Sequence, residues 1–210
     1  METSKLWNSL NEENWNDSLR RYWDFVKPTH LSIEKEFDSF DIAKIVEMDE
    51  KEWFDFLMDK YFVWKYTAPN RYATTKKQLE RYLGPDDNLD SLFEIKKTLL
   101  EIDKGNIKKC LETVSSIRGL GVAGASGLLA VLYPKDYATV DQFVVKALSS
   151  ITGLPEIGHI NKMRPEQLTI NNGVILIEIM RNKAADLNNI FSCSTWTPRK
   201  IDMVLWVSDR

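Results

Sequence analysis

Apolar side chains recur along this chain mainly at the helical spacings of three and four residues, and they almost nowhere alternate with the period of two that marks a strand. The strongest pattern covers residues 49–64, where one helical face carries Trp53, Phe54, Phe56, Leu57, Tyr61 and Trp64. Similar patterns predict helices over residues 18–26, from 32 to a break near 41, and over 75–83, 89–102, 105–117, 123–132, 141–153, 173–187 and from 197 onward. We therefore expect an all-α protein with about nine helices in one or two lobes.

Capping residues indicate where several of these helices begin. Thr197 followed by Pro198 is typical of an N-cap and a first helical position. Asp141 precedes an apolar helical pattern in the same way, and either Asn171 or Asn172 is expected to cap the helix over 173–187.

Charge is distributed unevenly along the chain. The net charge is −3, but residues 1–103 contain 15 Lys and Arg against 22 Asp and Glu, whereas residues 104–210 contain 13 against 9. We expect either a single unit or an acidic lobe over 1–103 and a basic lobe over 104–210, with a helical hairpin at 105–132 in the basic part. That basic balance is compatible with a phosphate-bearing partner.

Composition narrows the class of protein further. No run approaches the roughly 18 apolar residues of a membrane span, and the polar start of the chain has no apolar signal core, so we expect a cytoplasmic protein without membrane contact. Cys110, Cys193, His30 and His159 form neither a disulfide framework nor a zinc-ligand pattern, and no metal site is expected. Residues 1–16 are polar apart from a few anchors and are predicted to be a loosely docked arm.

The most informative stretch, residues 117–141, reads IRGLGVAGASGLLAVLYPKDYATVD. Gly119 and Gly121 allow a tight turn and a close approach of another backbone or a ligand. A helix is predicted before this turn and another after it, so that free backbone N–H groups and the positive end of the second helix point to one place outside the protein. A phosphate is the natural occupant of that place.

Several residues are therefore candidates for binding DNA. The expected phosphate site consists of Arg118, Gly119, Gly121, Val122, Ala123 and Gly124. Further candidate DNA contacts are Lys108, Lys109, Arg199 and Lys200. The glycine turn also has a purely structural interpretation, as a short connection between two helices. Arg199 could equally form a salt bridge, for example with Asp202 three residues later.

Asp141 is the candidate catalytic residue. A carboxylate at the start of a helix is held in its charged form by the helix dipole and the free N–H groups. It could position or deprotonate a water molecule, or stabilise positive charge that develops on a sugar. The alternative is that Asp141 serves only as a helix cap.

This stretch resembles the helix-hairpin-helix of the base-excision DNA glycosylases, the superfamily that includes endonuclease III. The matching residues are Ile117, Gly119, Leu120 and Gly121 in the turn, followed by Val140 and Asp141 at the start of a helix. The resemblance covers only about residues 105–150. It implies two helical lobes, a hairpin that grips a phosphate of double-stranded DNA, and an Asp facing a cleft that receives a flipped base. It also allows a structural monovalent cation at the hairpin.

The sequence departs from that family in three places. Bifunctional members carry a catalytic lysine two residues after the second hairpin glycine, and this chain has Ala123 there, which cannot form a Schiff base. The four-cysteine iron–sulfur cluster of some members is absent, so no cofactor is expected. Arg118 occupies a position that is usually Pro. The stretch also resembles that of poorly characterised bacterial relatives.

Three hypotheses follow for the function. The first is a DNA-binding hydrolase of base excision repair, a monofunctional glycosylase that excises or recognises a damaged or modified base. The second is a non-catalytic helix-hairpin-helix module that binds DNA. The third is a protein-interaction scaffold in which the glycines only form a turn. An aromatic-walled pocket within reach of Asp141 would favour the first hypothesis over the second.

Overall fold

The computed structural model describes residues 2–84 and 88–208, and within these ranges the protein is all-α. The α-helices are α1 (Thr3–Trp7), α2 (Glu12–Phe25), α3 (Pro28–Asp38), α4 (Ala43–Glu47), α5 (Glu50–Asp55), α6 (Phe62–Lys65), α7 (Pro69–Leu79), α8 (Leu89–Glu101), α9 (Ile107–Ser115), α10 (Val122–Leu132), α11 (Gln142–Ser149), α12 (Ile157–Ile160), α13 (Ile170–Ile190) and α14 (Pro198–Ser208). A π-helical turn, η1 (Phe56–Tyr61), joins α5 to α6, and a 3-10 turn, η2 (Glu80–Leu83), follows α7. The described residues thus contain more helical segments than the nine expected, because several are only four to six residues long.

The first residues do not form a loose arm. Residues 3–7 are helical, and α2 already begins at Glu12. Trp15 is fully buried, with its ring 6.3 Å from that of Trp7 and 5.7 Å from that of Trp196. Aromatic burial of this size explains why a polar segment docks firmly on the C-terminal part of the chain.

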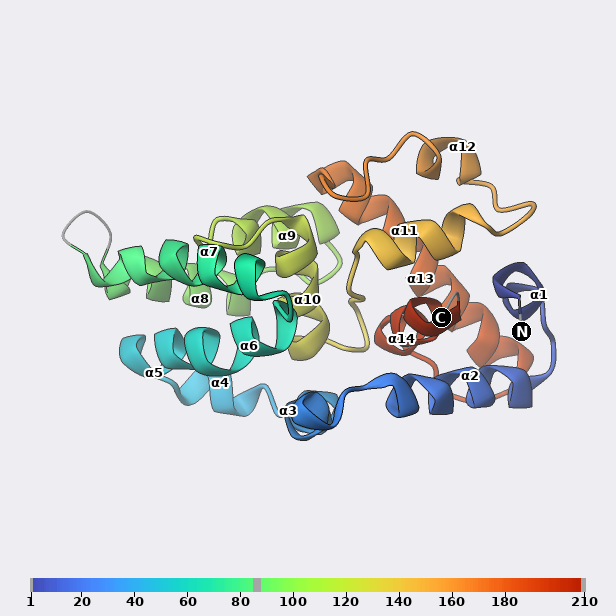
Figure 1. Ribbon diagram of the computed structural model, residues 1–210, viewed down its shortest axis with the longest axis horizontal. Coiled ribbons are helices and arrows are strands. Elements are labelled where there is room, and N and C mark those ends of the chain that lie inside the picture. The colour runs from blue at the N-terminus through green and yellow to red at the C-terminus, as the bar shows by residue number, and fades with distance from the viewer. Residues whose placement is uncertain (1, 85–87, 209–210) are drawn as a thin grey trace.

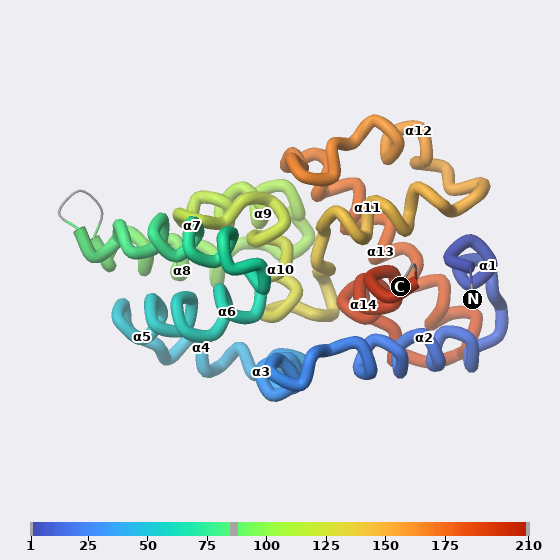
Figure 2. The backbone as a smooth tube through the Cα atoms, viewed as in Figure 1, coloured from blue at the N-terminus to red at the C-terminus, as the bar shows by residue number. Residues whose placement is uncertain are grey.

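The helices form two groups with α3 between them (Figure 1). Helices α4 to α10 lie in one group, and α1, α2 and α11 to α14 lie in the other, with both chain ends on that side (Figure 2). Helix α2 packs extensively against α14, while α13 contacts both α14 and α9. The change of charge near residue 103 therefore does not coincide with a division of the helices in space.

Residues 50–65 form one continuous helical stretch that supplies much of the aromatic core. Asp49 caps it with a capping box: its side chain accepts a hydrogen bond from Glu52 N, and the Glu52 carboxylate accepts one from Asp49 N. Trp53 stacks on Phe56, with ring centroids 5.6 Å apart. After this stretch Pro69 begins α7, where its fixed φ suits the first helical turn.

The starts of two more helices can be compared with the sequence predictions. Helix α13 begins at Ile170 and is capped by Thr169, whose capping-box partner is Asn172; the expected caps Asn171 and Asn172 are both inside the helix. The start of α14 at Pro198 is confirmed, and Thr197 Oγ1 accepts a hydrogen bond from Lys200 N at 3.3 Å.

Candidate functional site

The glycine turn joins α9 to α10, and its two glycines have different roles. Gly119 has a φ of 89°, in the left-handed region that favours glycine. A Cβ atom at this position would lie 2.8 Å from the carbonyl oxygen of Thr75 and 3.1 Å from the Phe62 ring. Gly119 is therefore required both by the backbone conformation and by the close approach of α7.

Gly121 is the N-cap of α10, and it faces open space. Its φ is −84°, and a Cβ atom there would meet nothing within 4 Å. No side chain of the described residues caps α10, so the N–H groups at the start of this helix have no side-chain acceptor. Gly121 is exposed, Ala123 is partly buried, and Val122 and Gly124 are buried. The six expected phosphate-site residues thus lie together, in the turn and at the start of α10. Arg118, however, is only partly exposed, and its backbone N–H donates to Tyr82 Oη at 3.2 Å.

Small residues in α10 allow another helix to approach closely. The Tyr61 hydroxyl donates to the carbonyl oxygen of Gly124, and the Tyr66 hydroxyl donates to that of Gly119 at 2.9 Å. A Cβ atom on Gly124 would lie 2.6 Å from Tyr66 Oη, and one on Gly127 would lie 2.7 Å from Tyr61 Oη. These two glycines make room for the hydroxyl groups of Tyr61, the last residue of η1, and Tyr66, which follows α6.

Asp141 is the N-cap of α11, as the sequence predicted. Its Oδ1 accepts hydrogen bonds from Phe143 N at 2.9 Å and from Val144 N at 3.1 Å. The preceding residues are also fixed, since Val140 N donates to Ser126 Oγ at 2.9 Å and links this segment to α10. The capping role is thus confirmed, and both capping bonds use a single carboxylate oxygen.

Asp141 also lines a cavity of about 440 Å³. This volume lies in the range of small-molecule sites. The walls come from five separate parts of the chain: the end of α2, helix α3, the end of α6 with the following residues, residues 139–144, and α14. Its aromatic lining residues are Tyr22, Phe25, Trp64, Phe143 and Trp206. The cavity therefore has the aromatic walls that distinguish the first hypothesis from the second.

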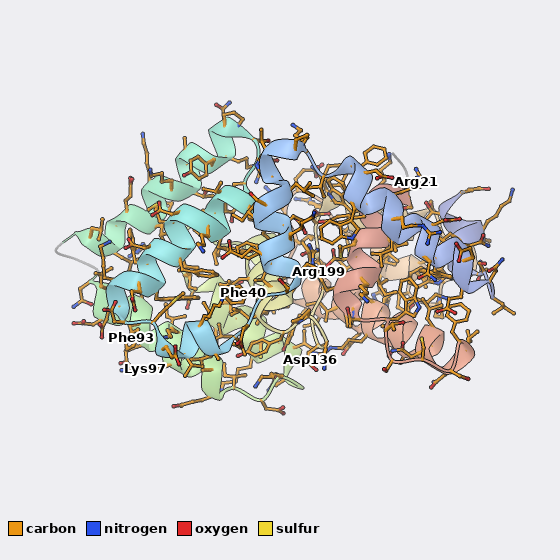
Figure 3. All side chains as sticks on the ribbon, turned by 90° about the horizontal axis from the view of Figure 1, so that it is seen from below. Arg21, Phe40, Phe93, Lys97, Asp136 and Arg199 are labelled. Atoms are coloured by element: carbon orange, nitrogen blue, oxygen red, sulfur yellow. The ribbon has the colours of Figure 1, made fainter. Side chains whose placement is uncertain are left out.

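A buried ionic cluster is part of the cavity lining. Arg199 Nη2 lies 2.7 Å from Glu34 Oε1, and Nη1 lies 2.5 Å from Asp202 Oδ1, which confirms the salt-bridge interpretation of Arg199. Glu34 also accepts hydrogen bonds from Tyr22 Oη at 2.6 Å and from Trp64 Nε1 at 2.5 Å. Figure 3 labels Arg199 near the middle of the molecule.

Burial and the attraction between opposite charges shift the pKa values of this cluster in opposite directions. Burial raises the pKa of Asp202 to about 6, against the opposing effects of Arg199 and of the Thr139 N–H that donates to it. Burial alone would lower the pKa of Arg199, but Asp202, Tyr22 and Glu34 outweigh it and raise that pKa. Arg199 consequently stays charged and paired, so it orders the cavity wall and is not a free cation.

Lys65, the last residue of α6, also lines the cavity. Its side chain is partly buried, and it has no hydrogen bond or ion pair among the described residues. Burial lowers the pKa of this amine, while Asp141 and Asp202 act against the shift. Thr139 contributes another unsatisfied group, since its buried Oγ1 has no hydrogen-bond partner within the described ranges.

The remaining candidate cations lie elsewhere. Lys108 and Lys109 are exposed on α9, and Lys108 Nζ lies 3.9 Å from Glu112. Lys200 Nζ donates to the carbonyl oxygen of Thr195 at 2.8 Å. None of these three lysines lines the cavity around Asp141.

Several cavity residues were not expected from the sequence, namely Tyr22, Glu34, Lys65, Thr139 and Asp202. The run of aromatic and basic residues at 61–66 was a usable indication for Lys65. Such a run is typical either of a helix buried in the core or of a surface that contacts a ligand. Both apply: Tyr61 and Phe62 are fully buried, while Trp64 and Lys65 line the cavity.

No helix within residues 2–84 and 88–208 combines the length and apolar character needed to cross a membrane. The same ranges contain no group of three or more His, Cys, Asp or Glu side chains arranged to hold a metal ion. Comparisons with protein-family models, with curated proteins and with solved structures found no match. The function must therefore be argued from the site itself.

Proposed function

We propose that this protein is a DNA-binding protein of the monofunctional DNA glycosylase type, which excises a damaged or modified base. The observation that carries the proposal is the position of Asp141 in the wall of an aromatic-lined cavity. Enzymes that act on a base must take it out of the duplex and hold it between aromatic or apolar side chains. Trp64, Tyr22 and Phe143 supply such side chains in this cavity.

The turn between α9 and α10 would hold the DNA backbone while the base enters the cavity. The N-terminal amides of α10 have no side-chain cap, and the space next to Gly121 is open. Backbone amides and the positive end of a helix favour a phosphate there. Val140 and Ser126 connect α10 to the segment that carries Asp141, so phosphate contact and catalytic residue belong to one packed unit.

Asp141 would act on the sugar of the flipped nucleotide. Only its Oδ1 is used in capping α11, which leaves Oδ2 to face a ligand in the cavity. A carboxylate there can orient or deprotonate a water molecule, and it can stabilise positive charge on the sugar as the base departs. General acid–base catalysis of this kind contributes about 10²–10⁴-fold in rate.

A non-catalytic DNA-binding or protein-interaction module is the second candidate. It is favoured by the capping bonds of Asp141, which explain the presence of an Asp at this position without any chemistry. The two candidates differ in one outcome: only the enzyme releases a base.

The test is a screen of the purified protein against duplex oligonucleotides that each carry one of a range of base lesions. Asp141→Asn keeps a capping oxygen but removes the charge, so base release should be lost while folding and DNA binding remain. Asp49→Asn is the matched control, because Asp49 is also a helix N-cap, at the start of α5, and does not line the cavity. Release that is unchanged in Asp141→Asn would refute the catalytic assignment, and release of no base at all would favour the module.

A further inference from the structure

The backbone segment that carries Asp141 is held by side chains of two other helices. Thr139 N donates to Asp202 Oδ2 on α14 at 2.6 Å, and Val140 N donates to Ser126 Oγ on α10 at 2.9 Å. Asp202 and Ser126 are both buried, so solvent competes little for these two hydrogen bonds. The two backbone amides that precede Asp141 are therefore positioned by α14 and α10.

Asp202 differs from Ser126 because it also belongs to the buried ionic cluster. Its other oxygen, Oδ1, lies 2.5 Å from Arg199 Nη1. One carboxylate thus connects the backbone before Asp141 to a guanidinium group that is itself buried. Hydrogen bonds to a charged acceptor are shorter and stronger than those to a neutral one, so ionised Asp202 holds the Thr139 amide more firmly than a neutral side chain would.

The same cluster reaches every wall of the cavity. Arg199 Nη2 lies 2.7 Å from Glu34 Oε1 on α3. The Glu34 carboxylate also accepts hydrogen bonds from Tyr22 Oη on α2 and from Trp64 Nε1 on α6. Each of the five parts of the chain that line the cavity therefore contributes a member or a direct partner of one network. Asp202 connects this network to the wall that contains the proposed catalytic residue.

The charge on Asp202 costs stability, which indicates a role other than stability. Replacing a buried ion pair by well-packed hydrophobic residues is often neutral or stabilising. Burial raises the pKa of Asp202 from its ordinary value of 3.8 to about 6, so the folded protein disfavours the charged form. The carboxylate nevertheless lies within bonding distance of Arg199 and of the Thr139 amide, two donors that bind a charged acceptor most strongly.

We propose that Asp202 is a positioning residue, whose ionised carboxylate holds residues 139–141 so that Asp141 faces a ligand in the cavity. This role rests on the proposed function, because Asp141 is the group that is positioned. When Asp202 is neutral, its bonds to Arg199 and to Thr139 N weaken, and Asp141 is no longer fixed relative to the aromatic walls. A displacement of about 1 Å at a reacting group can lower a rate by about 10²-fold.

Charged and titratable groups of several elements act on Asp202. Arg199 and Lys65 favour its ionised form, whereas Asp141 opposes it. The remaining titratable groups of the cavity lining are Tyr22, Lys27, His30 and Glu34.

The first test is the pH dependence of single-turnover base release from the best duplex of the lesion screen. Wild type should show an acid limb with a midpoint at about pH 6. Asp202→Asn is neutral at every pH, so this limb should be absent, and the rate at alkaline pH should fall at least about 10-fold with an unchanged dissociation constant of the duplex. His30→Gln is the control and should keep the limb, because histidine is the usual source of a titration near neutral pH. A wild-type rate or a wild-type limb in Asp202→Asn would overturn the proposal.

The second test uses amide NMR of the isotope-labelled protein and needs neither DNA nor activity. In wild type the Thr139 amide should titrate with a midpoint at about pH 6. The amides of Phe143 and Val144, which donate to Asp141 Oδ1, should show a change with the same midpoint. A Thr139 amide without this titration, or a titration that does not extend to Phe143 and Val144, would overturn the proposal.

The change with this midpoint should vanish from all three amides in Asp202→Asn. The Glu52 amide, which donates to Asp49, is the internal control and should behave alike in both proteins. Loss of the titration in Asp202→Asn together with no base release by wild type would leave the positioning role standing and refute the glycosylase. Base release with the same acid limb in both proteins would do the reverse.

Urea unfolding separates positioning from a loss of folding. The folded-state pKa of Asp202 lies above the ordinary value, so the folded state binds the proton more tightly and wild type should lose stability as pH rises from 3.8 to about 6. Asp202→Asn should lack this loss, so its stability relative to wild type should rise over the range in which its relative activity falls. A stability difference that is constant over this range would overturn the proposal, because Asp202 would then not be ionised against burial.

Discussion

Replacing Gly119 and Gly121 separately by alanine tests the account of the hairpin turn, because the two glycines are only two residues apart but have different surroundings. At Gly119, an alanine must adopt a φ of 89° and place its Cβ atom 2.8 Å from the carbonyl oxygen of Thr75. The left-handed conformation costs about 1–2 kcal/mol and overpacking typically costs about 1–3 kcal/mol, so Gly119→Ala should lose about 2–5 kcal/mol of stability.

Gly121→Ala should change stability far less than Gly119→Ala does. The backbone at Gly121 has a φ of −84°, and its new Cβ atom would meet nothing within 4 Å. Alanine at a compatible glycine position restricts the unfolded chain and stabilises a protein by about 0.4–1 kcal/mol, but alanine is a poorer helix N-cap than glycine, so the two effects roughly cancel. Urea unfolding measures both variants, and a lower midpoint with an unchanged m-value identifies a true loss of stability. A stable Gly119→Ala, or a Gly121→Ala as unstable as Gly119→Ala, would refute this account of the turn.

Three further predictions follow from the site. Gly121→Asp adds a favourable cap to α10 that uses the same amides as a phosphate, so it should keep stability but weaken DNA binding in a fluorescence anisotropy titration. Gly121→Ser should weaken binding less. Equal binding by wild type and both variants would exclude the turn as a phosphate site. Arg199→Met leaves Glu34 and Asp202 buried without their partner and should cost about 3–5 kcal/mol in urea unfolding; a loss below about 1 kcal/mol would contradict the paired, buried cluster. Burial lowers the pKa of Lys65, so the unfolded state binds more protons. Wild type should therefore gain stability over Lys65→Met as pH rises from the folded pKa toward the ordinary lysine pKa of 10.5. A difference that is constant over this alkaline range would show that the amine is not desolvated. The charged groups that act on Lys65 are Asp141, Asp202, Glu34 and Arg199.

Local patterns were sufficient to predict α10 and the start of α11. The predicted helix over 123–132 matches α10, and Asp141 caps α11 as expected, because both features depend on residues that are close in sequence. The salt bridge of Arg199 with Asp202 was also predictable, since three residues separate them on one helix. The prediction of helix starts that depend on capping boxes was less accurate. At Thr169, for example, two nearby Asn residues were predicted to be the cap instead.

The cavity itself could not be predicted, because its walls come from parts of the chain that are far apart in sequence. Glu34 reaches Arg199 across 165 residues, and Tyr22 reaches it across 177. A helical pattern states which face of α2 or α3 is apolar, but not which other helix will cover it. Lys65 shows the same limit: its neighbours Tyr61 and Phe62 have the pattern of a buried helix, and only the packing against α10 brings its amine beside Gly127.

The central claim is that Asp141 acts on the sugar of a nucleotide whose base is held in the aromatic-lined cavity. The most direct measurement is single-turnover base release from the best duplex substrate of the lesion screen, with DNA binding measured on the same duplex. The account predicts that Asp141→Asn lowers the rate by at least about 10²-fold and leaves the dissociation constant of the duplex nearly unchanged, while Asp49→Asn matches wild type. A rate in Asp141→Asn equal to that of wild type would contradict the claim.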